Sequence, residues 1–107
     1  MSELENIILA NKLLEVYGDL LTSNQKAIMS DYYAYNLSFA EIAKNRKISR
    51  AAVSDSLKKS LLKLENFENK LQIIKNNGQI LKDLEQLEML SKDVQILELI
   101  NKIKGMM

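Results

Sequence analysis

The sequence predicts an all-α protein, and three observations lead to that prediction. The chain of 107 residues contains no Pro and only 3 Gly, whereas a sheet protein needs both for its tight turns. Leu, Ile, Lys and Glu are abundant, which is typical of helical domains. Apolar residues also recur at helical spacing along much of the chain. The length suits a domain with a core large enough to fold unaided.

The composition excludes several classes of chemistry. The chain has no Cys, so it has no disulfide framework and no thiolate metal site. It also has no His, which removes the usual zinc ligand, the usual general base and every Ser-His-Asp or Cys-His nucleophile system. No Gly-rich loop is present to cradle a nucleotide phosphate. We therefore expect no catalytic residues, no metal site and no cofactor, and we interpret the chain as a protein that is not an enzyme.

Membrane and export signals are not expected either. No apolar run approaches the roughly 20 residues of a membrane-spanning helix. The first residues, Met1–Glu5, are acidic and lack the basic start of a signal peptide. The expected location is the cytoplasm.

The first two helices are marked by their starting residues. Ser2 and Glu5 form a capping-box pattern, in which a hydroxyl and a carboxylate each satisfy a free amide at a helix start. This predicts a helix over residues 2–17, because Gly18 is a natural stop. Thr22 and Gln25 repeat the pattern and predict a second helix that fades over residues 35–37.

The third and fourth helices carry the same kind of signal. Ser38 and Glu41 predict a short helix that ends in a polar break over residues 45–47. A fourth helix is predicted from Ser49 to about Lys75, followed by a break over residues 76–78 (Asn-Asn-Gly). Three apolar residues at helical spacing should form its buried face: Val53, Leu57 and Leu61.

A fifth helix is predicted over residues 79–104, with an apolar stripe at near-heptad steps: Leu81, Leu84, Leu87, Leu90, Val94 and Leu97. We therefore divide the chain into a bundle over residues 1–75 and a C-terminal helix over residues 76–107. A helix of that length, about 1.5 Å per residue, should extend beyond the bundle. Uncovered apolar surface of this kind predicts a homodimer, unless the helix folds back and buries the stripe within one chain.

Charge is concentrated in the middle of the chain. Residues 38–63 hold 7 basic and 2 acidic residues, a net charge of +5, although the whole chain has a net charge of only +1. Two consecutive capped helices in this stretch predict a helix-turn-helix motif over about residues 38–60. In that motif the second helix enters the DNA major groove with its N-terminal residues.

Candidate DNA-binding residues follow from the helical phase. With Val53 and Leu57 facing the core, five residues of the reading helix face outward: Arg50, Ala51, Ser54, Asp55 and Lys58. Arg50 can grip a guanine with two hydrogen bonds. Six basic residues could contact phosphates: Lys44, Arg46, Lys47, Lys58, Lys59 and Lys63. Asp55 would repel a phosphate, but it could accept from a cytosine amino group or pair with Lys58 or Lys59.

Other interpretations of these residues stay open. Charged residues on a helix often only solvate it, and a helix-turn-helix also serves protein partners. The tyrosines at 32, 33 and 35 could stack on bases, although packing in the core or at its rim is the simpler interpretation for most of them.

Five segments of the chain form a recognisable pattern: Leu20–Gln25, Asp31–Tyr33, Ser38–Ala43, Ile48–Asp55 and Leu64–Leu71. With these segments the chain resembles, over about residues 14–71, the YlxM family of small bacterial proteins. Proteins of that family are similar to the C-terminal DNA-binding region of sigma factors. The resemblance implies a sigma-factor-like helix-turn-helix bundle and a DNA-binding or regulatory role. Genes of the family lie beside those for the signal recognition particle GTPase and its receptor, which implies a role in that pathway.

Two departures from the family pattern bear on function. The family usually has Gln and Tyr at two positions near the start of the reading helix, where this chain has Ala51 and Ser54. Both changes remove side chains that could touch or stack on bases. They favour weak DNA binding, and they leave open a protein-interaction module that docks on the signal recognition particle GTPase or its RNA.

Overall fold

The computed structural model describes residues 2–107, and every regular element in this part of the chain is helical. The predicted all-α class is therefore confirmed. None of the helices described is both long enough and apolar enough to span a bilayer. The chain forms two compact units, one that ends at Leu71 and one that comprises Gln72–Met107.

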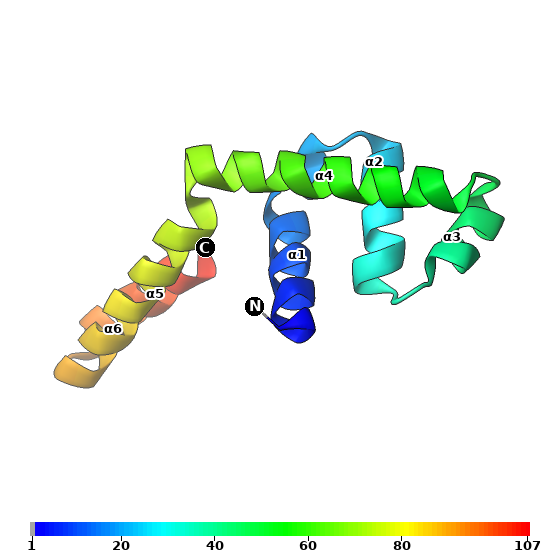
Figure 1. Ribbon diagram of the computed structural model, residues 1–107. Coiled ribbons are helices and arrows are strands. Elements are labelled where there is room, and N and C mark those ends of the chain that lie inside the picture. Colours follow the sequence, from blue (N-terminus) through cyan, green and yellow to red (C-terminus); the bar gives the residue numbers. More distant parts are fainter. Residues whose placement is uncertain (1) are drawn as a thin grey trace. The chain divides into compact units, whose positions relative to one another are not determined.

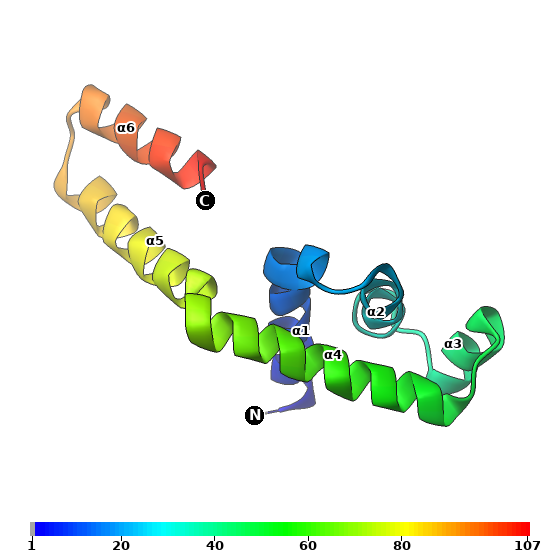
Figure 2. The ribbon, with the colours of Figure 1, turned by 90° about the horizontal axis from the view of Figure 1, so that it is seen from above.

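The first unit is built around one long helix, α4 (Arg50–Leu71), which lies across the other helices of the unit (Figure 1). Figure 2 shows the first three helices in chain order along α4, with the third beside the beginning of α4. Two short segments link them. The elements that precede α4 are α1 (Glu3–Tyr17), the 3₁₀ helix η1 (Gly18–Leu20), α2 (Ser23–Met29), the π-helix η2 (Ser30–Ala34) and α3 (Phe39–Arg46).

The predicted caps set the starts of α1 and α2. The Ser2 hydroxyl accepts from the Glu5 amide at 3.1 Å, so α1 begins at Glu3. At α2, the Thr22 hydroxyl accepts from the Gln25 amide, and the Gln25 side chain accepts from the Thr22 amide. Both pairs satisfy amides that the first helical turn leaves without partners.

The core of the first unit lies between α4 and the three earlier helices. Ile28, Ile42, Val53 and Leu64, which come from α2, α3 and α4, are fully buried. At the other end of α4, the ring of Tyr17 stacks on Phe67 with centroids 6.0 Å apart. The Tyr17 hydroxyl donates to the Glu68 carboxylate at 2.6 Å, so the polar end of this buried side chain is satisfied.

The second predicted helix ends over residues 35–37, as the sequence predicts, but its last turn widens into a π-helix. The amide of Tyr35 donates to the carbonyl of Ser30 at 3.0 Å, one residue further than in an α-helix. Asn36 then takes a left-handed conformation, with φ of 56°, and ends the segment. This local change positions Tyr32 and Tyr33 on one side of η2.

The helix boundaries predicted for the second half of the chain were wrong at two places. α4 ends at Leu71, because Gln72 adopts a left-handed conformation with φ of 54°. The Asn76-Asn77-Gly78 sequence, where a break was predicted, lies inside α5 (Ile73–Leu90). The single helix predicted over residues 79–104 is instead two helices, because the chain leaves helical geometry at Ser91 and α6 (Val94–Gly105) begins after Asp93.

The second unit is a pair of helices in contact with each other. The Asp93 carboxylate accepts from the Gln95 amide at 2.8 Å and caps α6. Leu84 of α5 and Ile100 of α6 are buried, and Lys104 forms an ion pair with Glu88 across the two helices. Much of the predicted apolar stripe is nevertheless exposed. Each helix has only one neighbouring helix within the unit, and that neighbour covers only one of its faces.

Candidate nucleic-acid interface

The candidate interface is built from α3, a tight turn and the beginning of α4. Ser38 and Glu41 fix the start of α3 by a reciprocal pair of hydrogen bonds. The Glu41 amide donates to the Ser38 hydroxyl at 3.1 Å, and the Ser38 amide donates to the Glu41 carboxylate at 3.0 Å. These bonds favour the ionised carboxylate, so the pKa of Glu41 lies below its usual value, with the backbone bond as the larger cause.

The turn between the two helices is only three residues long, Lys47–Ser49, and starts later than the predicted polar break. Lys47 adopts the left-handed conformation, with φ of 57°, and the amide of Ile48 donates back to the carbonyl of Ala43 at 3.0 Å. This is the bonding pattern of a Schellman turn, in which Gly is the usual residue at the left-handed position. The Ser49 hydroxyl then accepts from the Ala52 amide at 3.0 Å and caps α4.

The helical phase of α4 decides which of its residues face away from the core. Val53 and Leu57 are buried, as predicted, whereas Leu61 is only half-buried. The buried face instead continues through Ser60 and Leu64. Residues at the opposite phase are therefore turned outward.

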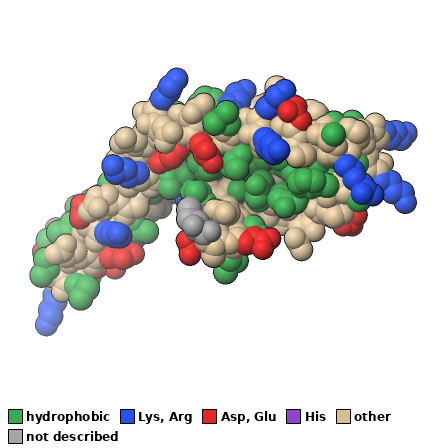
Figure 3. Space-filling model, viewed as in Figure 1, with side chains coloured by type: hydrophobic (Ala, Val, Ile, Leu, Met, Phe, Trp, Pro, Cys, Tyr) green, Lys and Arg blue, Asp and Glu red, His purple; other side chains and the backbone are tan. Residues whose placement is uncertain are grey.

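The candidate residues taken from the sequence are mostly accessible. Ser54 and Lys63 are half-buried. The other eight are exposed: Lys44, Arg46, Lys47, Arg50, Ala51, Asp55, Lys58 and Lys59. Basic side chains gather where α3 meets α4, and more of them follow the surface of α4 (Figure 3). Four of the exposed cations, Lys44, Arg46, Lys47 and Arg50, fall within seven residues of chain at this end of the unit.

Two of the candidate residues are held by acidic partners. The Arg46 guanidinium donates to the Asp31 carboxylate at 2.6 Å, and this bond is the main cause that raises the pKa of Arg46. Lys59 pairs with Asp55 one helical turn away, at 3.0 Å between nitrogen and oxygen. The predicted pairing of Asp55 with a nearby lysine is thus present. Both pairs reduce the positive charge that the surface offers to a phosphate.

Sequence reasoning missed Asp31 as a member of this site. It lies in η2, 15 residues before its partner Arg46, and no local pattern connects the two positions. Among residues 2–107 no group of three or more acidic side chains could hold a metal ion.

α3 and α4 are both capped at their starts and are joined by a three-residue turn, and the N-terminus of α4 presents an outward face. This arrangement defines a helix-turn-helix protein of the all-α class. The model of the UPF0122 family, described as "Putative helix-turn-helix protein, YlxM / p13 like", matches residues 4–104, and the chain belongs to this family. The resemblance noted in the sequence is confirmed, and the match also includes the second unit.

Several curated proteins are similar to this chain. It is 35% identical over 96 residues to a UPF0122 protein of Oceanobacillus iheyensis, covering 90% of this chain and 91% of that protein. It is 43% identical over 72 residues to the UPF0122 protein YlxM of Bacillus subtilis, covering 67% of this chain and 66% of that protein. The identity rises to 52% with a UPF0122 protein of Malacoplasma penetrans, over 62 residues that span 58% of each chain.

Proposed function

We propose that this chain is a cytoplasmic DNA-binding regulatory protein that places the beginning of α4 in the major groove. One observation supports this role above all: exposed cations surround the capped, tightly turned junction of α3 and α4. Arg50 is the first residue of α4 and is exposed, where a reading helix presents its N-terminal side chains to base edges. Lys44 and Lys47 flank it on the α3 side and would contact phosphates.

The same surface favours weak reading of sequence. Ala51 and Ser54 are too short to span the groove, and Asp55 is occupied by Lys59. Arg50 and Lys58 therefore remain the two long cations among the five outward candidates that form no ion pair with an acidic residue between 2 and 107. Of these two, Arg50 lies at the N-terminus of α4, where a reading helix meets the bases. Contacts to the DNA phosphates supply the affinity in such a complex, and these contacts do not depend on the base sequence.

The second unit supports a homodimer as part of this proposal. A helical hairpin of this size lies below the roughly 40 residues at which a chain usually buries enough surface to be stable alone. Leu90 and Val94, on either side of the bend, are 76% and 67% exposed. Two copies that pair through these hairpins would form a four-helix arrangement and cover the stripe. They would also bring two reading helices together, as paired DNA half-sites require.

Sedimentation of the intact chain tests the dimer. The Leu90→Lys/Val94→Lys variant should sediment as a monomer at concentrations where the parent protein is a dimer, because it places two charges in the proposed interface. Leu20→Lys, which changes a similarly exposed leucine of η1, is the matched control and should remain dimeric. A monomeric parent protein at tens of micromolar would end the dimer proposal.

The alternative is a protein-interaction module that uses the same fold to dock on the signal recognition particle GTPase or its RNA. The observations that favour it are the small residues at 51 and 54 and the two acidic partners on the basic surface. Both limit base reading, but neither affects docking on a protein.

Titration at two salt concentrations separates these functions. The intact protein is titrated against promoter DNA, the particle's RNA and the GTPase. DNA binding through about three to five phosphate contacts predicts a slope of about −3 to −4 in a plot of log affinity against log salt. Arg50→Ala should lower DNA affinity by about 1–3 kcal/mol if that residue reads a base. Absence of DNA binding at low salt, together with binding to the GTPase, would replace the DNA proposal with the alternative.

A further inference from the structure

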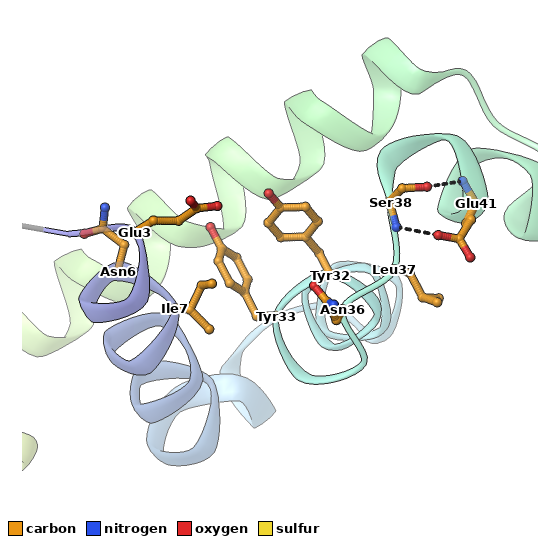
Figure 4. Close-up of a pocket in the computed structure, with 9 residues that line it drawn as sticks. All are labelled: Glu3, Asn6, Ile7, Tyr32, Tyr33, Asn36, Leu37, Ser38 and Glu41. Carbon is orange, nitrogen blue, oxygen red and sulfur yellow. Dashed lines mark hydrogen bonds between the residues drawn. The ribbon is translucent and has the colours of Figure 1, made fainter.

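The π-helix η2 borders a hollow that the nucleic-acid surface does not use. The hollow has a volume of about 600 Å³ and lies between α1, η2 and the start of α3 (Figure 4). That volume is within the range of small-ligand sites. A π-helical turn is rare and is often found at functional sites, and here the π-helix and the hollow lie together in the first unit.

Aromatic rings form one wall of the hollow. Tyr32 and Tyr33 stand edge to face, with centroids 4.9 Å apart and planes at 89°, and Tyr32 also contacts the ring of Phe39 at 5.2 Å. The side-chain amide of Asn11 donates to the Tyr33 carbonyl at 2.9 Å and fixes η2 against α1. The wall is thus held in place by contacts outside the hollow. Two perpendicular rings present a π-face, which is electron-rich, to a group in the space beside them.

Among the described residues, the two charged side chains that line the hollow are both acidic. Glu3 and Glu41 belong to its lining, which contains no Lys or Arg among the described residues. Figure 4 shows the Glu3 carboxylate on the same side as the hydroxyl ends of Tyr32 and Tyr33. Burial, followed by the charges of Tyr32 and Glu65, raises the pKa of Tyr33, as expected where the surroundings are negative.

The helix N-termini beside the hollow do not make it a site for anions. Free amides at a helix N-terminus attract anions, and both α1 and α3 begin beside the hollow. Here the Ser2 hydroxyl accepts from the Glu5 amide, and the Ser38 hydroxyl accepts from the Glu41 amide. The Glu41 carboxylate also adds a negative charge to the first turn of α3. These caps and charges offset the positive ends of the two helices.

We propose that this hollow binds an organic cation, a guanidinium or alkylammonium group, against the faces of Tyr32 and Tyr33, with Glu3 as its counter-ion. The aromatic faces, the apolar side chain of Ile7 and the carboxylate together match a charged group carried on an apolar stem. Such a group can come from a basic side chain of another protein or from a free polyamine.

The test is an NMR titration of the intact, isotope-labelled protein. The probes are blocked arginine (N-acetyl-arginine methylamide), spermidine and the uncharged analogue N-acetyl-citrulline methylamide. The two cations should shift the amide signals of η2 and the first turn of α1 and should saturate at millimolar concentration, whereas the citrulline compound should not. Tighter binding of blocked arginine assigns the site to a protein side chain, and tighter binding of spermidine assigns it to a polyamine.

Matched variants locate the binding. Glu3→Gln should weaken the cation by about three- to fivefold, the size of one exposed charge or cation–π contact. Glu5→Gln, in the same helical turn but outside the lining, should leave it unchanged. Tyr32→Leu should also weaken binding, whereas Tyr35→Leu, at an exposed residue just beyond η2, should not. No saturable shift up to about 20 mM, equal binding of the citrulline compound, or equal loss in Glu3→Gln and Glu5→Gln would overturn the proposal.

Discussion

Arg46 and Asp31 form an ion pair of 2.6 Å that joins the last residue of α3 to the π-helix η2. The Asp31 side chain is 14% exposed and that of Arg46 is 34% exposed, so the pair is partly shielded from water. It holds the end of α3, and with it the turn that leads into α4. It also neutralises one of the cations that the candidate interface would otherwise offer to DNA.

This double role predicts that two substitutions at the pair affect DNA binding in opposite directions. Asp31→Asn and Arg46→Gln should each lower the free energy of unfolding by about 1 kcal/mol, because each breaks a partly shielded ion pair. Asp31→Asn should nevertheless strengthen DNA binding at low salt, since it releases Arg46 and removes an acidic charge. Arg46→Gln should weaken DNA binding.

Denaturant melts and DNA titrations of the two variants check this prediction. Asp19→Asn is the control, because it breaks the ion pair with Lys26 outside the helix-turn-helix motif. Its DNA affinity should stay close to that of the parent protein. If Asp31→Asn and Arg46→Gln change DNA affinity in the same direction, Arg46 has no role at the DNA surface.

The phase of α4 predicts a large difference between two neighbouring residues. Leu57 is buried, and Leu57→Ala should lower the free energy of unfolding by about 2–5 kcal/mol through lost burial and a residual cavity. Lys58 is exposed, and Lys58→Ala should cost less than about 0.5 kcal/mol. Urea melts of the two variants compare them directly. A larger loss for Lys58→Ala would contradict the helical phase on which the candidate interface depends.

Substitution of the left-handed turn residue Lys47 should change folding stability and DNA binding in opposite directions. Lys47 has φ of 57°, a conformation that costs a residue with a Cβ about 1 kcal/mol and costs Gly little. Lys47→Gly should therefore raise the free energy of unfolding by about 0.5–1 kcal/mol. It should also weaken DNA binding and make the salt slope shallower by about one, because one cation is lost. Lys47→Asn, which tolerates the left-handed region and also lacks the charge, should show the same binding loss.

The first half of the fold was predictable because its signals are local. Each of the four helices of the first unit begins at a Ser or Thr whose hydroxyl accepts from the amide three residues further on, and such patterns are visible in the sequence. The widening of α2 into η2 gave no such signal. The residues of η2 instead form contacts with distant parts of the chain, among them the bonds from Asn11 to Tyr33 and from Arg46 to Asp31.

The second half shows where local signals fail. Asn76-Asn77-Gly78 predicts a break, but intrinsic helix propensity has only a small effect on the free energy of a helix. Gly78, for example, costs a helix only about 1 kcal/mol. The helix continues through these residues, and α5 packs on α6. Gln72 ends α4 without any Gly or Pro, so nothing in the sequence marks it. The break at residues 91–93 did carry a signal, since Asp93 is a good helix cap, but the regular apolar stripe concealed it.

The capping box of α3 predicts how the protein responds to acid. In the folded chain the pKa of Glu41 is lowered, first by the Ser38 backbone amide and then by its hydroxyl, relative to an ordinary value of 4.5. The unfolded chain therefore takes up this proton at a higher pH than the folded chain does. The stability that the carboxylate contributes is present above pH 4.5 and is lost as the pH falls through the folded pKa.

Thermal melts at about pH 6 and about pH 3 test this dependence. Glu41→Gln keeps an oxygen that can accept from the Ser38 amide but cannot be protonated in this range, so its melting temperature should fall less than that of the parent protein on acidification. Ser38→Ala should lower stability by about 1 kcal/mol at neutral pH, because the α3 cap is lost. It should still retain much of the parent's sensitivity to acid, since the backbone amide of residue 38, the larger cause of the lowered pKa, remains in place. If Glu41→Gln and the parent protein lose the same amount of stability in acid, the capping carboxylate is not the group that responds.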